Sequence, residues 1–120
     1  MMIDAFLPSN LATITLSVAA AVQHAALPVG TISPINNWRV GGEYLEVQNT
    51  GGVNVFMETG PGGEVGGVQT CNVVATVAAS YPVLPGQCKV IRRAPGDTHM
   101  SIIGAAAGPT VVFVTAGNGV

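Results

Sequence analysis

Short stretches of alternating polar and apolar residues, separated by turns rich in glycine and proline, restrict most strongly how this chain can fold. Residues 13–18 alternate without a break and place Ile14, Leu16 and Val18 on one side of an extended strand, because successive side chains of a strand point to opposite faces. The chain also holds 16 Gly and 8 Pro, which disrupt helices and form turns. The sequence therefore predicts an all-β fold of short strands, as in a sandwich or a barrel.

Three pairs of consecutive strands separated by turns are predicted further along the chain. They are residues 43–48 with 53–58, residues 71–79 with 88–92, and residues 99–103 with 110–115. The first pair flanks Asn49-Thr50-Gly51-Gly52 and is typical of a β-hairpin. We expect the core of the sandwich to contain the inward-facing apolar residues of these strands, namely Ile14, Leu16, Leu45, Val47, Val53, Val55, Ile102, Val112 and Val114.

Two other segments have a less regular pattern. Residues 60–67 are rich in glycine and predict an exposed loop, without the Lys-Ser/Thr ending of a phosphate-binding loop. Residues 19–27 contain several alanines, but the preceding alternation and the lack of a helix cap favour a strand or an extended arm. At 120 residues, the chain is predicted to be a single domain, with residues 1–12 as a possible extended arm.

Charged residues are scarce, and this scarcity excludes several classes of function. Only 8% of the residues are charged, with 4 Lys+Arg and 6 Asp+Glu, against about 25% in ordinary soluble domains. Catalysis usually needs neighbouring titratable groups and nucleic-acid binding needs a basic surface. We therefore expect neither an enzyme nor a nucleic-acid binder, and no cofactor. No uninterrupted apolar stretch is long enough for a membrane helix, and no basic segment starts a secretion signal.

The residues that most often carry chemistry all have simpler structural interpretations here. Cys71 and Cys88 match no zinc or redox motif and are expected to be small buried side chains, with a disulfide as the alternative. His24 and His99 lack a nearby nucleophile motif and are expected to form structural hydrogen bonds or to face solvent. The acidic residues of the central region are not spaced as in a calcium loop, so we expect no metal site.

The expected function is therefore binding to other proteins, through weakly charged surfaces. The N-terminal segment contains a single charge and is expected to lie against a neighbouring subunit. Trp38 is interpreted either as a core residue or as an interface anchor, and a small basic cluster can pair with acidic groups of a partner. The candidate interface residues are Met1, Met2, Ile3, Phe6, Leu7, Trp38, Arg39, Lys89, Arg92 and Arg93.

About two-thirds of the chain resembles the small capsid decoration, or cement, proteins of tailed bacteriophages. The motifs that carry the resemblance are LEVQNTG at 45–51, VNV at 53–55, YPVLPG at 81–86, THM at 98–100, AAAG at 105–108 and VFVTAGNG at 112–119. The resemblance implies a β-sandwich of the jelly-roll type that binds the outer surface of an assembled capsid. It brings no catalytic residues.

This resemblance leads to definite expectations about partners and location. The partner would be the major capsid protein, and the chain would itself form a homo-oligomer, either a dimer or a trimer. It would be made in the host cytoplasm and located on the outer capsid surface of the virion. Two alternatives remain: a tail, neck or fibre-associated virion component, and a small ligand- or carbohydrate-binding sandwich, although only 5% of the residues are aromatic.

Overall fold

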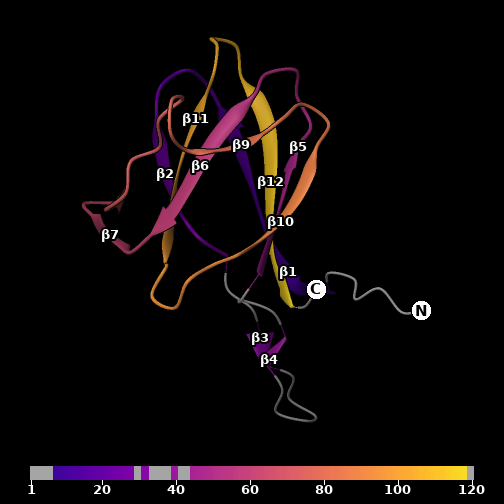
Figure 1. Cartoon of the computed structure of the whole chain (residues 1–120). Coiled ribbons are helices and arrows are strands. Elements are labelled where there is room, and N and C mark those ends of the chain that lie inside the picture. Colours follow the sequence, from indigo (N-terminus) through magenta and orange to yellow (C-terminus); the bar gives the residue numbers. More distant parts are fainter. Residues whose placement is uncertain (1–6, 29–30, 33–38, 41–43, 119–120) are drawn as a thin grey trace.

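The computed structural model describes residues 7–28, 31–32, 39–40 and 44–118, and within them the chain forms only strands and turns. Figure 1 shows the strands in chain order. Their bounds are β1 Leu7–Val18, β2 Gln23–Ala26, β3 Thr31–Ile32, β4 Arg39–Val40, β5 Tyr44–Asn49, β6 Val55–Gly60, β7 Gly62–Val65, β8 Val68–Cys71, β9 Tyr81–Val83, β10 Cys88–Arg92, β11 His99–Gly104 and β12 Thr110–Asn118.

Eight of these strands form two four-stranded antiparallel sheets. Sheet A has the strand order β1-β12-β5-β10, and sheet B has the order β2-β11-β6-β9. The two sheets pack face to face around the core (Figure 1). The four other strands make two small ribbons, β3 with β4 and β7 with β8. The predicted all-β sandwich is therefore confirmed.

The strand pairing follows one long ribbon that is folded over itself. β1 pairs with β12, β2 with β11, β5 with β10 and β6 with β9, so the first half of the chain runs antiparallel to the second half. The ribbon is then wrapped so that β12 lies beside β5 and β11 lies beside β6. Eight strands wound in this way into two sheets form a jelly roll.

The core lies between the sheets and contains most of the residues predicted to point inward. Leu45, Val47, Val55, Ile102, Val112 and Val114 are fully buried. Ile14 and Leu16 pack against the same core but are only half-buried, because β1 lies at the edge of sheet A. Val53 differs from the prediction, since it is a half-buried residue in the turn that precedes β6.

The predicted hairpin between β5 and β6 is wrong. These two strands belong to different sheets, and the same is true of β9 with β10 and of β11 with β12. Each of these connections is an arch from one sheet to the other, and each strand takes its neighbours from more distant parts of the chain. Alternating strands around a glycine-rich turn are compatible with either a hairpin or an arch, so the local pattern does not distinguish them.

Asn49 holds the arch between β5 and β6. Its side chain is fully buried, and its amide donates hydrogen bonds to the carbonyl oxygens of Val53 at 2.8 Å and Val83 at 3.0 Å. Its Oδ1 accepts from the backbone N–H of Gly51 at 3.1 Å and from the hydroxyl of Thr110 at 3.0 Å. One side chain thereby connects the turn to β9 and β12.

We expect Asn49→Ala to lower the free energy of unfolding by about 2–4 kcal/mol, because it leaves several buried polar groups without partners. Thr50→Ala is the control, since it removes a single exposed hydrogen bond, from the Thr50 hydroxyl to the Val111 carbonyl. We expect that substitution to lower the same free energy by less than about 1 kcal/mol. Chemical denaturation measures both values. Equal losses for the two variants would show that Asn49 does not hold the arch.

Residues 61–80, here termed the insertion, connect β6 to β9 and differ from the prediction. The glycine-rich stretch is not a loop but the β7–β8 hairpin, in which Gly66 and Gly67 have φ angles of 59° and 84°, as a tight two-residue turn requires. Residues 72–79 form bends and turns instead of the predicted strand. β9 instead starts within the predicted turn. Its Pro82 is tolerated because β9 is an edge strand.

The possible extended arm of residues 1–12 overlaps strand β1. Leu7 and Pro8 pair with Asn118 and Gly117 of β12, and regular pairing resumes at Thr13 after an irregularity. Residues 7–12 thus belong to β1, whereas residues 1–6 lie outside the described part of the chain. Within residues 19–27 the chain forms β2, in agreement with the expected strand.

Candidate interaction surface

The insertion covers part of the outer face of sheet B. Ser101 on β11 faces away from the core, yet it is fully buried. Its hydroxyl accepts a hydrogen bond from the backbone N–H of Ala75 at 2.8 Å, so the insertion lies directly over it. Gly60 lies under Val73, whose Cγ2 would be 2.9 Å from a Cβ atom at position 60. A side chain there would push the insertion away, so this glycine allows the insertion to lie directly on sheet B.

His99 fixes the β7–β8 hairpin to the same face. Its Nδ1 is 2.8 Å from the hydroxyl oxygen of Thr98, and its Nε2 is 2.8 Å from Oε1 of Gln69 on β8. The expected structural role of His99 is therefore confirmed. His24 lies opposite Ser101 on β2, and its Nδ1 is buried without a hydrogen-bond partner in the structure. Among the described residues, no group of three His, Cys, Asp or Glu side chains is placed to hold a metal ion.

Five exposed valines lie on the insertion and are here termed the valine surface. They are Val65, Val68, Val73, Val74 and Val77, with exposed fractions of 73%, 64%, 39%, 54% and 47%. Val65 and Val68 are opposite each other at the tip of the β7–β8 hairpin, which projects from the side of the sandwich (Figure 1). The insertion contains one charged residue, Glu64, whose carboxylate accepts a hydrogen bond from Gln69. Several exposed apolar side chains on one segment with a single charge favour a protein-binding surface.

The outer face of sheet A has a different character. One row across its four strands contains Thr15, Phe113, Gln48 and Cys88, and neighbouring rows add further threonines. The hydroxyls of Thr13 and Thr115 are 2.7 Å apart, in a hydrogen bond between β1 and β12. This face is mainly polar, and it includes the charged residues Glu46 and Arg92 as well as the exposed Val90 and Val111.

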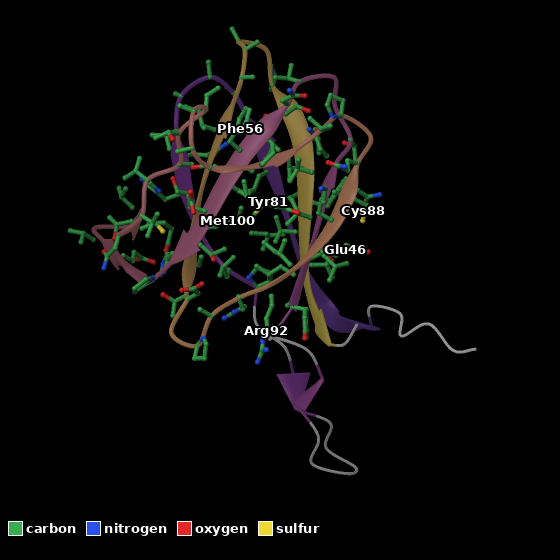
Figure 2. All side chains as sticks on the ribbon, viewed as in Figure 1. Glu46, Phe56, Tyr81, Cys88, Arg92 and Met100 are labelled. Atoms are coloured by element: carbon green, nitrogen blue, oxygen red, sulfur yellow. The ribbon has the colours of Figure 1, made fainter. Side chains whose placement is uncertain are left out.

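The two cysteines are free and lie in different environments. Cys71 is buried against Gly60, as expected, whereas Cys88 is exposed on the outer face of sheet A, contrary to the prediction. Figure 2 shows Cys88 next to Glu46 of the neighbouring strand. Partial desolvation of the thiol, its hydrogen bond to Glu46 and the negative charge of that carboxylate raise the pKa of Cys88.

We expect Glu46→Gln to accelerate alkylation of Cys88 near pH 8. A raised pKa leaves less of the reactive thiolate at this pH, and removing the carboxylate charge lowers the pKa again. The rate of reaction with iodoacetamide is measured as a function of pH in a Cys71→Ala background. Glu58→Gln, on β6 of the other sheet, is the control. An unchanged pH profile in Glu46→Gln would contradict this account of the thiol.

The predicted basic cluster is not a common surface patch. Lys89 and Arg92 lie on opposite faces of β10, because an odd number of positions separates them. The Lys89 ammonium is 5.4 Å from the centre of the Tyr81 ring, where it closes the edge of the sandwich between β9 and β10. Arg93 donates a hydrogen bond to the Pro28 carbonyl at 2.7 Å. Arg92 is exposed on the outer face of sheet A.

Most of the other predicted interface residues lie outside the described part of the chain. This is the case for Met1, Met2, Ile3, Phe6 and Trp38. Leu7 begins β1 and Arg39 begins the two-residue strand β4. Among the described candidates, Lys89 and Arg92 thus point to opposite faces of β10, and the interface formed by the remaining candidates stays a prediction.

Sequence reasoning missed the valine surface. The sequence pattern places Val73, Val74 and Val77 in a predicted strand and Val65 in a predicted loop, and it assigns Val68 to neither, so it does not indicate their common exposure. The available signal was the proximity of five valines to many glycines and a single charge within residues 61–80.

Comparison with models of known protein families finds no match, and no curated protein is significantly similar to this sequence. Within the described residues, no helix has the length and apolarity needed to cross a bilayer.

Proposed function

We propose that this chain is a structural virion protein that binds the outer surface of an assembled phage capsid and stabilises neighbouring major capsid subunits. The valine surface is the observation that carries the proposal. A jelly roll that covers one sheet with its own insertion, and then exposes five valines on that insertion, presents an apolar surface that only a partner can shield from water.

Two further observations support the same function. Jelly rolls recur in viral capsid and lectin domains, although a fold alone does not define a function. The motifs that resemble capsid decoration proteins fall on the strands and arches of the sandwich, including β5, β9 and β12. Segment 1–6 contributes additional contacts to the shell in this proposal.

Binding only to the assembled lattice explains how such a protein stabilises a capsid. A ligand that prefers the assembled state shifts the equilibrium toward it by mass action. Many copies that each contribute a modest contact give a large combined effect. The protein would be made in the host cytoplasm and would act as a homo-oligomer on the outside of the shell.

The proposal is tested by mixing the purified protein with undecorated shells and, separately, with unassembled major capsid protein. We expect saturable co-sedimentation with the shells and none with the unassembled subunits. Purified tails serve as the control particle, since a tail or neck component would bind there instead. Failure to bind shells at any concentration, or binding to tails alone, would contradict the proposal.

A further inference from the structure

The outer edge of β1 is a long, uncharged strand edge. β1 is the first strand of sheet A and pairs only with β12 among the described strands. It spans 12 residues, with the sequence LPSNLATITLSV, and contains no charged side chain and no proline after Pro8. The β3–β4 ribbon lies toward the end of β1 that pairs with the last residues of β12 (Figure 1).

Backbone hydrogen bonds elsewhere in sheet A establish which groups of β1 face this edge. The Val111 carbonyl accepts a hydrogen bond from the backbone N–H of Thr50, which directly follows β5, so the backbone groups of Val111 point toward β5. Because this direction alternates along a strand, residues 112 and 114 of β12 direct their backbone groups toward β1. Their partners, Leu16 and Ile14, point back toward β12. Thr13, Thr15 and Ser17 must therefore direct their N–H and C=O groups outward.

A separate contact agrees with this assignment. The Ser17 carbonyl accepts a 2.7 Å hydrogen bond from the side-chain amide of Gln23, which belongs to β2 and not to β12. Within the part of the chain that the structure describes, the N–H and C=O groups of Thr13 and Thr15 consequently form an open row that another strand can pair with.

The other three edges of sheets A and B carry features that discourage pairing. β9 has only 3 residues and contains Pro82, β10 contains Lys89 and Arg92, and β2 has only 4 residues. Short strands, prolines and charges are the usual protection of sheet edges. The β1 edge lacks all three along residues 13–18.

We propose that two copies of this chain form a two-fold symmetric dimer in which their β1 strands pair antiparallel along residues 13–17, with the Ser17 carbonyl using its second lone pair to accept from the partner. The pairing joins the two A sheets into one continuous sheet. We expect a register in which odd-numbered residues lie opposite odd-numbered residues. The hydroxyl side chains of Thr13, Thr15 and Ser17 then lie side by side on the outer face. On the inner face, Ile14 and Leu16 of one copy lie beside the same residues of the other.

Several properties of β1 favour a second copy as the occupant. Hydroxyl pairing across strands already occurs between Thr13 and Thr115. The half-buried Ile14 and Leu16 would lose more of their exposed surface, and the absence of charge means that two identical strands do not repel each other. The dimer does not depend on shell binding, because the valine surface lies on the insertion over the other sheet.

Sedimentation equilibrium of the full chain tests the proposal with the variants Thr15→Pro and Thr15→Ala. Proline removes an outward N–H from each copy without breaking a bond within sheet A, so we expect the dimer dissociation constant to rise by about tenfold or more. Alanine keeps this N–H and is expected to change the constant by less than about fivefold. A wild-type protein that stays monomeric, including one that pairs only with a strand of the shell protein, would overturn the proposal. So would a Thr15→Pro variant with a native circular dichroism spectrum and an unchanged dissociation constant.

Amide hydrogen exchange of the wild-type protein provides a test that needs no variant, in case Thr15→Pro does not fold. We expect the amides of Thr13 and Thr15 to be protected at concentrations where the dimer dominates and to exchange faster on dilution. Rapid exchange of both amides in a sample that sediments as a dimer would place the interface elsewhere and overturn the proposal.

Discussion

Replacing Val112 with aspartate is expected to abolish folding, whereas the same replacement at Val111 is expected to leave the sandwich intact. The two residues are neighbours on β12, but Val112 is fully buried between the sheets and Val111 is 40% exposed on the outer face of sheet A. A carboxylate at position 112 would be buried without a partner, at a cost of several kcal/mol. Total domain stabilities are only about 5–15 kcal/mol.

Circular dichroism and thermal unfolding of the two variants check this prediction. We expect Val111→Asp to retain the β spectrum and a cooperative transition, and Val112→Asp to lose both. Because the chemical change is identical, the comparison isolates the direction of the side chain. Equal stability of the two variants would mean that the inward face of β12 is wrongly assigned.

The second large effect is expected at the valine surface. Val68→Lys combined with Val74→Lys introduces two charges where the proposed shell contact excludes water. Burying a charge without a partner is strongly unfavourable, and we expect shell affinity to fall by about a hundredfold or more. Both residues are more than half exposed, so the free energy of unfolding should change little.

Val111→Lys is the matched control for this double variant. It places the same side chain on an exposed valine of sheet A, away from the insertion. We expect it to bind shells as the wild-type protein does, measured as copies bound per shell in a titration. If Val111→Lys lost affinity and the double variant did not, the shell contact would lie on sheet A.

The periodicity of individual strands was sufficient to predict the fold class and most of the core. Val47, Val55 and Val114 are buried because the two-residue period places them on the face that the opposite sheet covers. This information is local, and it is present in each strand separately.

Strand partners were not predictable in the same way. The turn after Gln48 has the sequence pattern of a hairpin, but the side chain of Asn49 binds the carbonyl oxygens of Val53 and Val83 and so directs the chain to the other sheet. One of these partners is 34 positions away. A local pattern contains no information about such a contact.

Which side chains share a surface was not predictable from the sequence, for a related reason. Lys89 and Arg93 are close in the sequence, yet Lys89 lies over the Tyr81 ring and Arg93 binds the Pro28 carbonyl. The exposure of the valine surface depends on the insertion lying on sheet B, which Gly60 and His99 make possible. Surfaces created by long-range packing become visible only in the folded chain.

The heat resistance of shells is the most direct test of the central claim that this protein stabilises an assembled capsid. The temperature at which undecorated shells disassemble is measured by light scattering, alone and after saturation with wild-type protein, the Val68→Lys/Val74→Lys variant or Val111→Lys. We predict a higher disassembly temperature with the wild-type protein and with Val111→Lys, and little or no increase with the double variant. An unchanged disassembly temperature in shells saturated with wild-type protein would contradict the claim.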